Sequence, residues 1–301
     1  DLQAAGRIPD PYWGDNLEAS GWTDERDWWY VRRFACPLEG DQRAFVVFSG
    51  IDYQSAVWAG RRLLGRHVGM FSPQRHEITA DLRAGAELDL AVRIHGSASL
   101  PRWEHTPAQR LARAAARLAG LGELPFADRL ATLKTQMSFG WDFAPRLLSM
   151  GIWDDVTLHV CRRAAIVDLW PQAEWPAGDF RVRDRLPLRL TLEIDSEREE
   201  PASLLVELWD EAGGPRQTWR FPLALAPGGR RYSVRGEIEA PALWQPWDRG
   251  RPALHTLRAT LLDAGDAPLD VAETMVGLRQ VRLVPQRPAR RGDAPWTWVV
   301  N

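Results

Sequence analysis

The sequence predicts an all-β protein made of two β-sandwiches, the first of which carries a helical insertion. Three observations support this fold class. Apolar and polar residues alternate along most of the 301 residues, as in strands with one buried face, and the longest such run extends from Leu186 to Ile194. Turn-forming glycines, such as Gly213-Gly214 and Gly228-Gly229, separate these runs. One segment, near residues 105–134, shows helical spacing instead.

The first expected domain covers residues 1–163 and suits a jelly roll, which is a large antiparallel sandwich. Its last strand alternates Val156, Leu158 and Val160 with polar residues, and this alternation predicts one buried face. The other expected strands are 28–36, 43–49, 54–59 and 88–94.

The helical insertion begins at a capping box. Residues 106–109 read T-P-A-Q, with threonine at the N-cap and proline at the first helical position. Apolar residues follow at helical spacing over 111–118, and Gly120 or Gly122 ends the helix. A second short helix is expected near 126–133. Insertions of this kind lie at loop ends, where binding sites are built, and the alternative is a structural flap.

The second expected domain covers residues 164–285. It suits an immunoglobulin-like sandwich, because about seven short strands with regularly spaced turns follow one another there. After Val284 the chain is rich in proline and arginine, and a new apolar strand begins at Trp296. Residues 286–301 are therefore expected to be a linker and the start of a further domain. The expected strands of the second domain are 166–170, 186–194, 203–209, 231–238, 254–262 and 273–284.

The composition argues against several classes of protein. The 38 basic and 40 acidic residues give a net charge of −2, so there is no basic excess to bind nucleic acid. No apolar run approaches the roughly 20 residues that a membrane span needs. The N-terminus shows no signal-peptide pattern, which leaves the compartment open and slightly favours the cytoplasm.

The sequence shows no motif for a catalytic, metal or cofactor site. The histidines form neither His-x-His nor H-E-x-x-H, so no metal site is expected. A glycine-rich phosphate loop and the G-x-S-x-G nucleophile motif are also absent, and no cofactor is expected. Cys36 and Cys161 are expected to be reduced, partly buried thiols, with one disulfide between neighbouring strands as the alternative.

The segment with the clearest chemical content is Ser138–Arg146, which reads S-F-G-W-D-F-A-P-R. One carboxylate, Asp142, stands between two aromatic residues and is flanked by glycine and proline, shortly before the alternating strand that follows G-I-W-D-D. This pattern is typical of an ordered loop that holds a carboxylate at a sheet edge. Aromatic faces pack on the C–H groups of sugars and carboxylates accept hydrogen bonds from their hydroxyls, so the loop suits sugar binding.

Motifs that resemble one enzyme family are spread in order over most of the chain. S-F-G-W-D-F-A-P-R, followed by G-I-W-D-D-V-T-L at Gly151–Leu158, is the most specific pair. The further segments are Ile8–Glu18, Asp27–Phe34, Phe48–Gly69 with its Gly60 and Gly65, Ala242–Trp247, Leu254–Leu257 and Gly277–Arg279. In this order and spacing they resemble the N-terminal part of β-mannosidase-type enzymes of glycoside hydrolase family 2.

The resemblance implies a jelly-roll sugar-binding domain, then an immunoglobulin-like domain and, beyond Asn301, a (β/α)8 barrel that carries both catalytic glutamates. Retaining glycosidases need these two carboxylates about 5 Å apart. No catalytic residue is therefore expected in this chain, which should be inactive alone. The implied partners are the chain's own barrel domain and a carbohydrate with a terminal β-mannoside.

By match to the family motif, Trp141 and Asp142 reach over the barrel mouth toward the sugar. The resemblance implies that Trp141 walls the pocket, that Asp142 accepts hydrogen bonds from substrate hydroxyls and that Arg146 pairs with Asp142 or holds the loop. In the alternative interpretation Asp142 caps a turn and Trp141 packs the loop. The family usually has Trp-Gly where this chain has Phe143-Ala144, which leaves the fine specificity open.

Tyr12, Asp15 and Asn16 are further candidates for lining the same mouth. For Asp15 and Asn16 the alternative role is helix capping. The rival functions are a β-galactosidase, β-glucuronidase or exo-glucosaminidase of the same family, a free-standing carbohydrate-binding module, and a structural spacer of two domains.

Overall fold

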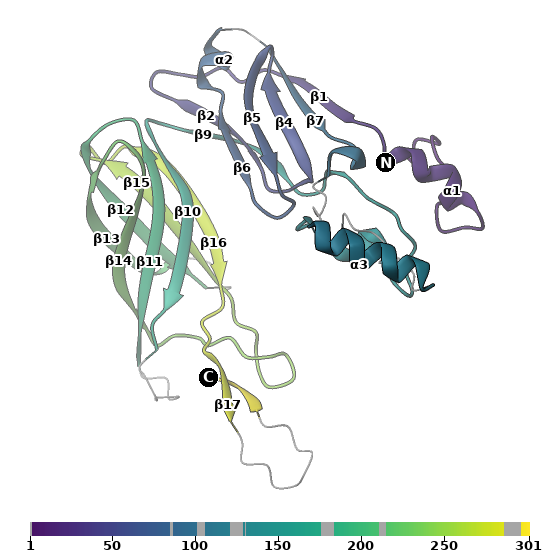
Figure 1. Cartoon of the computed structure of the whole chain (residues 1–301). Coiled ribbons are helices and arrows are strands. Elements are labelled where there is room, and N and C mark those ends of the chain that lie inside the picture. Colours follow the sequence, from purple (N-terminus) through teal and green to yellow (C-terminus); the bar gives the residue numbers. More distant parts are fainter. Residues whose placement is uncertain are drawn as a thin grey trace. The chain divides into compact units, whose positions relative to one another are not determined.

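The computed structural model of the chain describes residues 2–84, 87–100, 106–120, 129, 131–175, 184–210, 215–285 and 296–301. The chain divides into two compact units, Asp1–Val160 and Cys161–Asn301. Strands dominate both units (Figure 1), so the predicted all-β fold class is confirmed.

The first unit is a sandwich of antiparallel sheets. Its strands are β1 (Trp28–Phe34), β2 (Arg43–Phe48), β3 (Ile51–Asp52), β4 (Gln54–Ala59), β5 (Arg62–Val68), β6 (Gln74–Glu77), β7 (Leu88–Ile94), β8 (Gly151–Ile152) and β9 (Val156–Cys161). One main sheet has the order β1-β7-β4-β5 and the other has the order β6-β2-β9. Val46, Phe48, Val57 and Val92 belong to the core between them, and each is at most 2% exposed.

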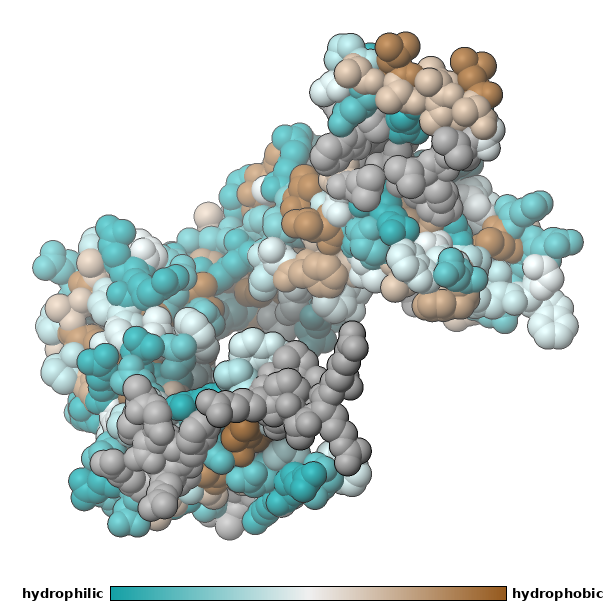
Figure 2. All heavy atoms as spheres, turned by 60° about the horizontal axis from the view of Figure 1, so that its bottom comes forward, coloured by the Kyte–Doolittle hydropathy of each residue, from teal (hydrophilic) through white to brown (hydrophobic). Residues whose placement is uncertain are grey.

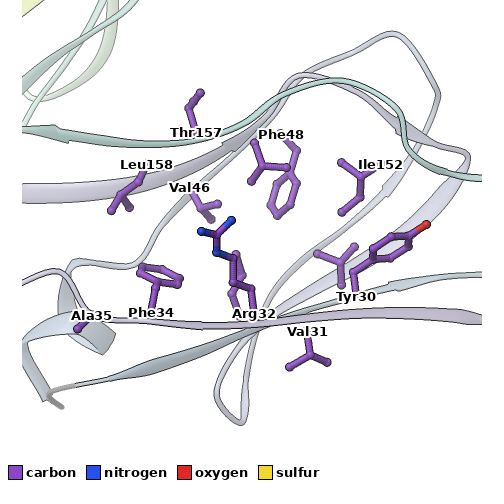
Figure 3. A pocket seen from close by; sticks show the side chains of 13 residues that line it. Tyr30, Val31, Arg32, Phe34, Ala35, Val46, Phe48, Ile152, Thr157 and Leu158 are labelled. Carbon is purple, nitrogen blue, oxygen red and sulfur yellow. The ribbon is translucent and has the colours of Figure 1, made fainter. Parts of the chain in front are cut away.

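The two main sheets leave a cavity of about 550 Å³ that both β1 and β9 line (Figure 3). Val156 and Leu158 of β9 line it and remain 45% and 39% exposed. The prediction of a buried face for this strand is therefore wrong at its first half. The reason is that β1 and β9 are edge strands of different sheets, and the described part of the chain does not fill the space beside them.

The predicted capping box and the first helix of the insertion are confirmed. The helix α3 (Pro107–Leu118) follows Thr106, whose Oγ1 accepts a hydrogen bond from Gln109 N–H at 3.3 Å. Gln109 Oε1 accepts one in return from Thr106 N–H at 2.9 Å. Gly120, with φ +74°, follows the helix end, as expected for a glycine that stops a helix.

The helix α3 presents apolar side chains to solvent. Leu111 and Leu118 are 74% and 90% exposed, and the helix has no buried residue. Hydrophobic side chains stand in small groups among hydrophilic ones on the face drawn in Figure 2. The second helix expected near 126–133 lies mostly outside the described residues. The shorter helices of this unit are α1 (Asn16–Ser20), η1 (Gly21–Thr23), α2 (Thr79–Ala84), η2 (Ser97–Ser99) and η4 (Gln136–Phe139).

The second unit is the predicted immunoglobulin-like sandwich. Its strands are β10 (Ala164–Ala173), β11 (Arg185–Ser196), β12 (Glu200–Trp209), β13 (Pro215–Leu225), β14 (Gly228–Glu239), β15 (His255–Asp263), β16 (Pro268–Val276), β17 (Val281–Pro285) and β18 (Trp296–Val300). The sheets have the orders β10-β11-β14 and β13-β12-β15-β16, and β17 pairs with β18. Alternation places Leu188, Leu190 and Leu192 of β11 in one core with Leu204 and Val206 of β12, each at most 1% exposed.

Two strands of the second unit differ from the sequence prediction. β13 is not among the expected strands; it contains Pro222, and it lies at a sheet edge, where the missing N–H of proline is tolerated. The single strand expected at 273–284 is instead β16 and β17. The chain leaves the sheet at Gly277, where an added Cβ would lie 3.1 Å from Trp244, and Leu278 O accepts a hydrogen bond from Trp244 N–H at 3.0 Å.

The structure also bears on the cysteines, on metal binding and on membrane spans. Cys36 and Cys161 are thiols and form no disulfide with each other. Among the described residues, no group of three or more His, Cys, Asp and Glu side chains is placed to hold a metal ion. No helix in the described part of the chain has both the length and the apolar character that crossing a bilayer requires.

Candidate functional site

The segment Ser138–Arg146 folds into a tight turn at its centre. Trp141 and Ala144 exchange two backbone hydrogen bonds, of 2.8 Å from Trp141 N–H and 3.1 Å from Ala144 N–H. Asp142 and Phe143 therefore occupy the corner of the turn. Asp142 is exposed, and Trp141 and Phe143 are 44% and 79% exposed. The turn thus presents one carboxylate between two accessible rings.

Gly140 connects the turn to its support. Gly140 directly follows the short helix η4, and its φ of +95° and ψ of 150° fall in a region that is essentially restricted to glycine. Phe139, immediately before it, is fully buried. Only glycine therefore allows the chain to pass without strain from the buried ring to the exposed turn.

A small hydrophobic cluster lies beneath the loop. It contains Tyr53, Leu100, Phe139 and Leu148, each at most 6% exposed, with Met70 packed against them. This cluster is distinct from the main core of the sandwich. Because Phe139 precedes the turn and Leu148 follows it, the cluster holds the loop at both ends.

Two arginines pack on rings of the loop. The guanidinium carbon of Arg129 lies 4.7 Å from the centre of the Trp141 ring, and that of Arg146 lies 5.5 Å from the centre of the Phe139 ring. The Arg146 contact lies at the base of the loop, and the roles predicted for this residue stay predictions.

The motif G-I-W-D-D builds the base of the loop and not its tip. The Trp153 ring covers Gly50, where an added Cβ would lie 2.4 Å from the ring. Trp153 Nε1–H donates to Met70 O at 2.9 Å, and its backbone N–H donates to Gly50 O at 3.2 Å. Gly151 pairs with Asp52 between β8 and β3. These contacts fix the course of the chain just after the loop.

A buried ion pair at the loop base was not among the predicted site residues. Lys134 and Asp52 are each 2% exposed, and the Lys134 ammonium donates to the Asp52 carboxylate and to Ser149 O. Burial raises the pKa of Asp52 and lowers the pKa of Lys134, and in each case the charge of the partner opposes the shift. The sequence does hold a signal for this site, because Lys134 is the only lysine of the chain.

Tyr12, Asp15 and Asn16 lie in the N-terminal segment around α1. Tyr12 is 73% exposed, and its backbone N–H donates to Asp10 Oδ1 at 3.0 Å. Asn16 Nδ2–H donates to Asp10 O at 2.9 Å. Asp15 stands at the N-cap position of α1, but its side chain makes no capping hydrogen bond. The contacts of Tyr12 and Asn16 organise the turn before α1, and a place at the sugar site stays a prediction for all three residues.

The cavity lined by β1 and β9 in the first unit is a feature that sequence reasoning missed. Tyr30, Arg32 and Phe34 of β1 line it together with Val46 and Phe48 of β2. Figure 3 shows the Arg32 side chain extending from β1 into the space beneath the opposite strands. The sequence of β1, W-W-Y-V-R-R-F, predicts a strand but does not reveal a cavity beside it.

Family models match both units of the chain. Residues 1–154 match the glycosyl hydrolase 2 galactose-binding domain-like model, and residues 165–279 match the glycosyl hydrolases family 2 model. The two matches fall in the first and the second unit respectively.

Curated relatives align with nearly the whole chain. Beta-mannosidase B of Thermothelomyces thermophilus is 30% identical over 290 residues, which are 96% of this chain and 31% of that protein. Beta-mannosidase B of Aspergillus oryzae is 27% identical over 296 residues, which are 98% of this chain and 33% of that protein. The chain therefore spans about a third of the length of these relatives.

Solved structures share the fold. The β-D-mannosidase from Dictyoglomus thermophilum matches with a TM-score of 0.77 and 25% identity, covering 100% of this chain and 35% of that one. A putative β-galactosidase from Bacteroides fragilis matches with a TM-score of 0.64 and 18% identity, covering 92% of this chain and 35% of that one. Because the galactose-binding-like family model alone covers residues 1–154 of the 301, the chain belongs to glycosyl hydrolase family 2.

Proposed function

We propose that this chain is the substrate-recognition part of a retaining glycosidase that acts on terminal β-mannosides. In this proposal the turn Trp141–Ala144 forms one wall of the sugar-binding site, and a barrel domain outside the chain carries the catalytic carboxylates. The observation that carries the proposal is the exposed Asp142 at the corner of a turn whose flanking residues, Phe139 and Leu148, are buried.

The named relatives support the substrate class. Both curated relatives described above are beta-mannosidases B, and the solved structure with the TM-score of 0.77 is a β-D-mannosidase. The β-galactosidase from Bacteroides fragilis, at 18% identity, supports the fold alone. A mannoside is therefore favoured over a galactoside.

The proposed roles are binding and orientation. Asp142 accepts hydrogen bonds from sugar hydroxyls, and the Trp141 ring packs on C–H groups of the sugar. Neither residue makes or breaks a bond, since the two carboxylates of a retaining mechanism flank the scissile bond from the barrel. A hydrogen bond to a charged group contributes about 1.5–3 kcal/mol, so its loss should reduce kcat/KM measurably.

Steady-state kinetics of the parent enzyme that contains this chain test the proposal. Asp142→Asn keeps the side-chain shape and removes the charge, and it should lower kcat/KM for an aryl β-mannoside by about 10- to 100-fold. The matched control Asp248→Asn changes a carboxylate of the second unit that is 50% exposed, and it should stay within about twofold of the wild type. Equal kinetics for Asp142→Asn and the wild type would overturn the proposed role. Faster hydrolysis of β-galactosides or β-glucuronides than of β-mannosides would contradict the proposed substrate class, the terminal β-mannosides.

The chain by itself should neither hydrolyse a β-mannoside nor bind mannose measurably, because it supplies one wall of the site. Turnover by the 301-residue chain, purified free of contaminating hydrolase, would contradict the assignment of the catalytic groups to another domain. Binding at millimolar mannose or tighter that Trp141→Ala leaves unchanged would contradict the site assignment.

A further inference from the structure

Lys134 differs from every other basic side chain of this protein. The chain has 38 lysines and arginines, and Lys134 is the only lysine among them. It is 2% exposed, as is its partner Asp52. An ammonium is a compact head with three donors, whereas a guanidinium is a larger planar fork, so lysine is better suited to a confined site with acceptors on different sides.

The Lys134 ammonium joins three segments of the chain. It donates to the Asp52 carboxylate at the end of β3 and to the backbone carbonyl of Ser149. Lys134 precedes η4, and Ser149 follows the buried Leu148, so these two residues stand at opposite ends of the segment that contains the turn. One side chain therefore closes this loop at its base and ties it to the sandwich.

The ion pair lies where the main core borders the loop: Ile51, the residue before Asp52, belongs to the main core, whereas Tyr53, the residue after it, belongs to the small cluster beneath the loop. β3 pairs with β8 over only two residue pairs, Ile51 with Ile152 and Asp52 with Gly151. The next residue, Tyr53, accepts a hydrogen bond on its hydroxyl from Leu133 N–H at 3.0 Å and belongs to the small cluster beneath the loop. The ammonium and the Ser149 carbonyl both belong to the loop segment, whereas Ile51 remains held by its own burial in the main core. Loss of the ion pair should therefore release the loop and leave the main core of the sandwich intact.

We propose that Lys134 is the positioning residue of the recognition loop. Held between the Asp52 carboxylate and Ser149 O, it fixes residues 134–149 in the conformation that presents Trp141 and Asp142 to a sugar. The consequence for catalysis rests on the function proposed above, whereas the consequence for the loop does not.

The contacts of Lys134 with Asp52 and Ser149 are called the clamp below. Amide hydrogen exchange of the 301-residue chain tests directly whether this clamp holds residues 134–149 in place. Lys134→Met keeps an unbranched side chain and removes the charge, which leaves the buried Asp52 carboxylate without its ion-pair partner. Peptides covering residues 133–150 should then exchange at least about tenfold faster, whereas peptides from β4 and β7 should change by less than about twofold. Asp52→Asn, a smaller change, should give the same pattern and serves if Lys134→Met does not fold. The control Glu77→Gln, which alters the Arg43–Glu77 pair elsewhere in this unit, should leave peptides 133–150 unchanged.

Two results would overturn the clamp. One is unchanged exchange of residues 133–150 in both Lys134→Met and Asp52→Asn. The other is an equal acceleration in β4 and β7, because that would show a general loss of stability and not a released loop.

The kinetic consequence is measured in the parent enzyme. Lys134→Met should lower kcat/KM for an aryl β-mannoside by about tenfold, and Lys134→Arg, which keeps the charge, should recover part of the loss. A released loop with unchanged kcat/KM would support the positioning role of Lys134 and contradict the recognition role of the turn. The positioning role and the recognition role can therefore be contradicted independently of each other.

Discussion

Phe139 and Trp141 lie two residues apart, yet Phe139 is fully buried whereas Trp141 is 44% exposed. Gly140 separates them with a φ of +95°. The loop therefore has a buried base in the small cluster around Tyr53 and an exposed tip at Asp142. A short turn can hold a carboxylate rigidly when its base is packed in this way. The base and the tip can be tested separately.

Truncation of the buried ring should destabilise the first unit far more than truncation of the exposed one. Phe139→Ala empties space in a packed cluster and should lower the free energy of unfolding by about 3–5 kcal/mol. Phe143→Ala removes a ring that is 79% exposed and should change it by less than about 0.5 kcal/mol. Urea denaturation of both variants measures the difference. Similar losses in the free energy of unfolding would contradict the burial of the Phe139 ring at the base of the loop.

Gly140 should not tolerate a side chain. Its φ of +95° lies in a region where L-residues are strained, so Gly140→Ala should cost about 1–3 kcal/mol and lower the melting temperature. Gly21→Ala is the control, because Gly21 has a helical φ of −59° and an added Cβ would meet no atom within 4 Å. Gly21→Ala should leave the melting temperature unchanged or raise it slightly. Equal melting temperatures for the two variants would argue against the strained conformation at Gly140.

The free energy of unfolding of the first unit should fall in acid because of the partly buried His76. Burial lowers the pKa of His76, and the nearby charge of His67 lowers it further. Below the ordinary pKa of about 6.5 the unfolded chain then binds more protons than the folded one. The stability is therefore fully present above that pH and falls as the pH drops toward the folded-state pKa, by at most about 1.4 kcal/mol per pH unit for this group.

The His76 contribution is isolated by comparison with His76→Gln. The free energy of unfolding, measured from pH 8 to pH 5, should decrease more steeply for the wild type than for the variant. Parallel pH profiles would show that His76 does not titrate differently in the folded and unfolded chains.

Most of the fold follows from local patterns in the sequence. The alternation of β11 predicts its buried face, and the T-P-A-Q box predicts the start of α3. The edge strand β13 could not be predicted from the sequence in this way. Pro222 argues against a strand unless the position of that strand at the sheet edge is already known. The cavity beside β9 is equally invisible, since alternation gives the direction of a side chain and not what lies opposite it.

The candidate site is predictable only where its residues are close in sequence. Trp141 and Asp142 stand in one motif and lie in one exposed turn, and their role at a sugar site stays a prediction. Lys134 and Asp52 are 82 positions apart, so no spacing rule connects them, and the rarity of lysine in this chain is the one clue. Contacts across such distances depend on tertiary packing, which local patterns do not encode.

The proposed contact between Asp142 and the sugar is tested most directly by combining Asp142→Asn with mannosides that each lack one hydroxyl. Values of kcat/KM for the parent enzyme and the variant on each substrate form a cycle that isolates one hydrogen bond. If Asp142 binds a sugar hydroxyl, the effect of Asp142→Asn should disappear for at least one deoxy-mannoside, with a coupling energy of about 1.5–3 kcal/mol. Additive effects at every hydroxyl would contradict a direct contact between Asp142 and the substrate.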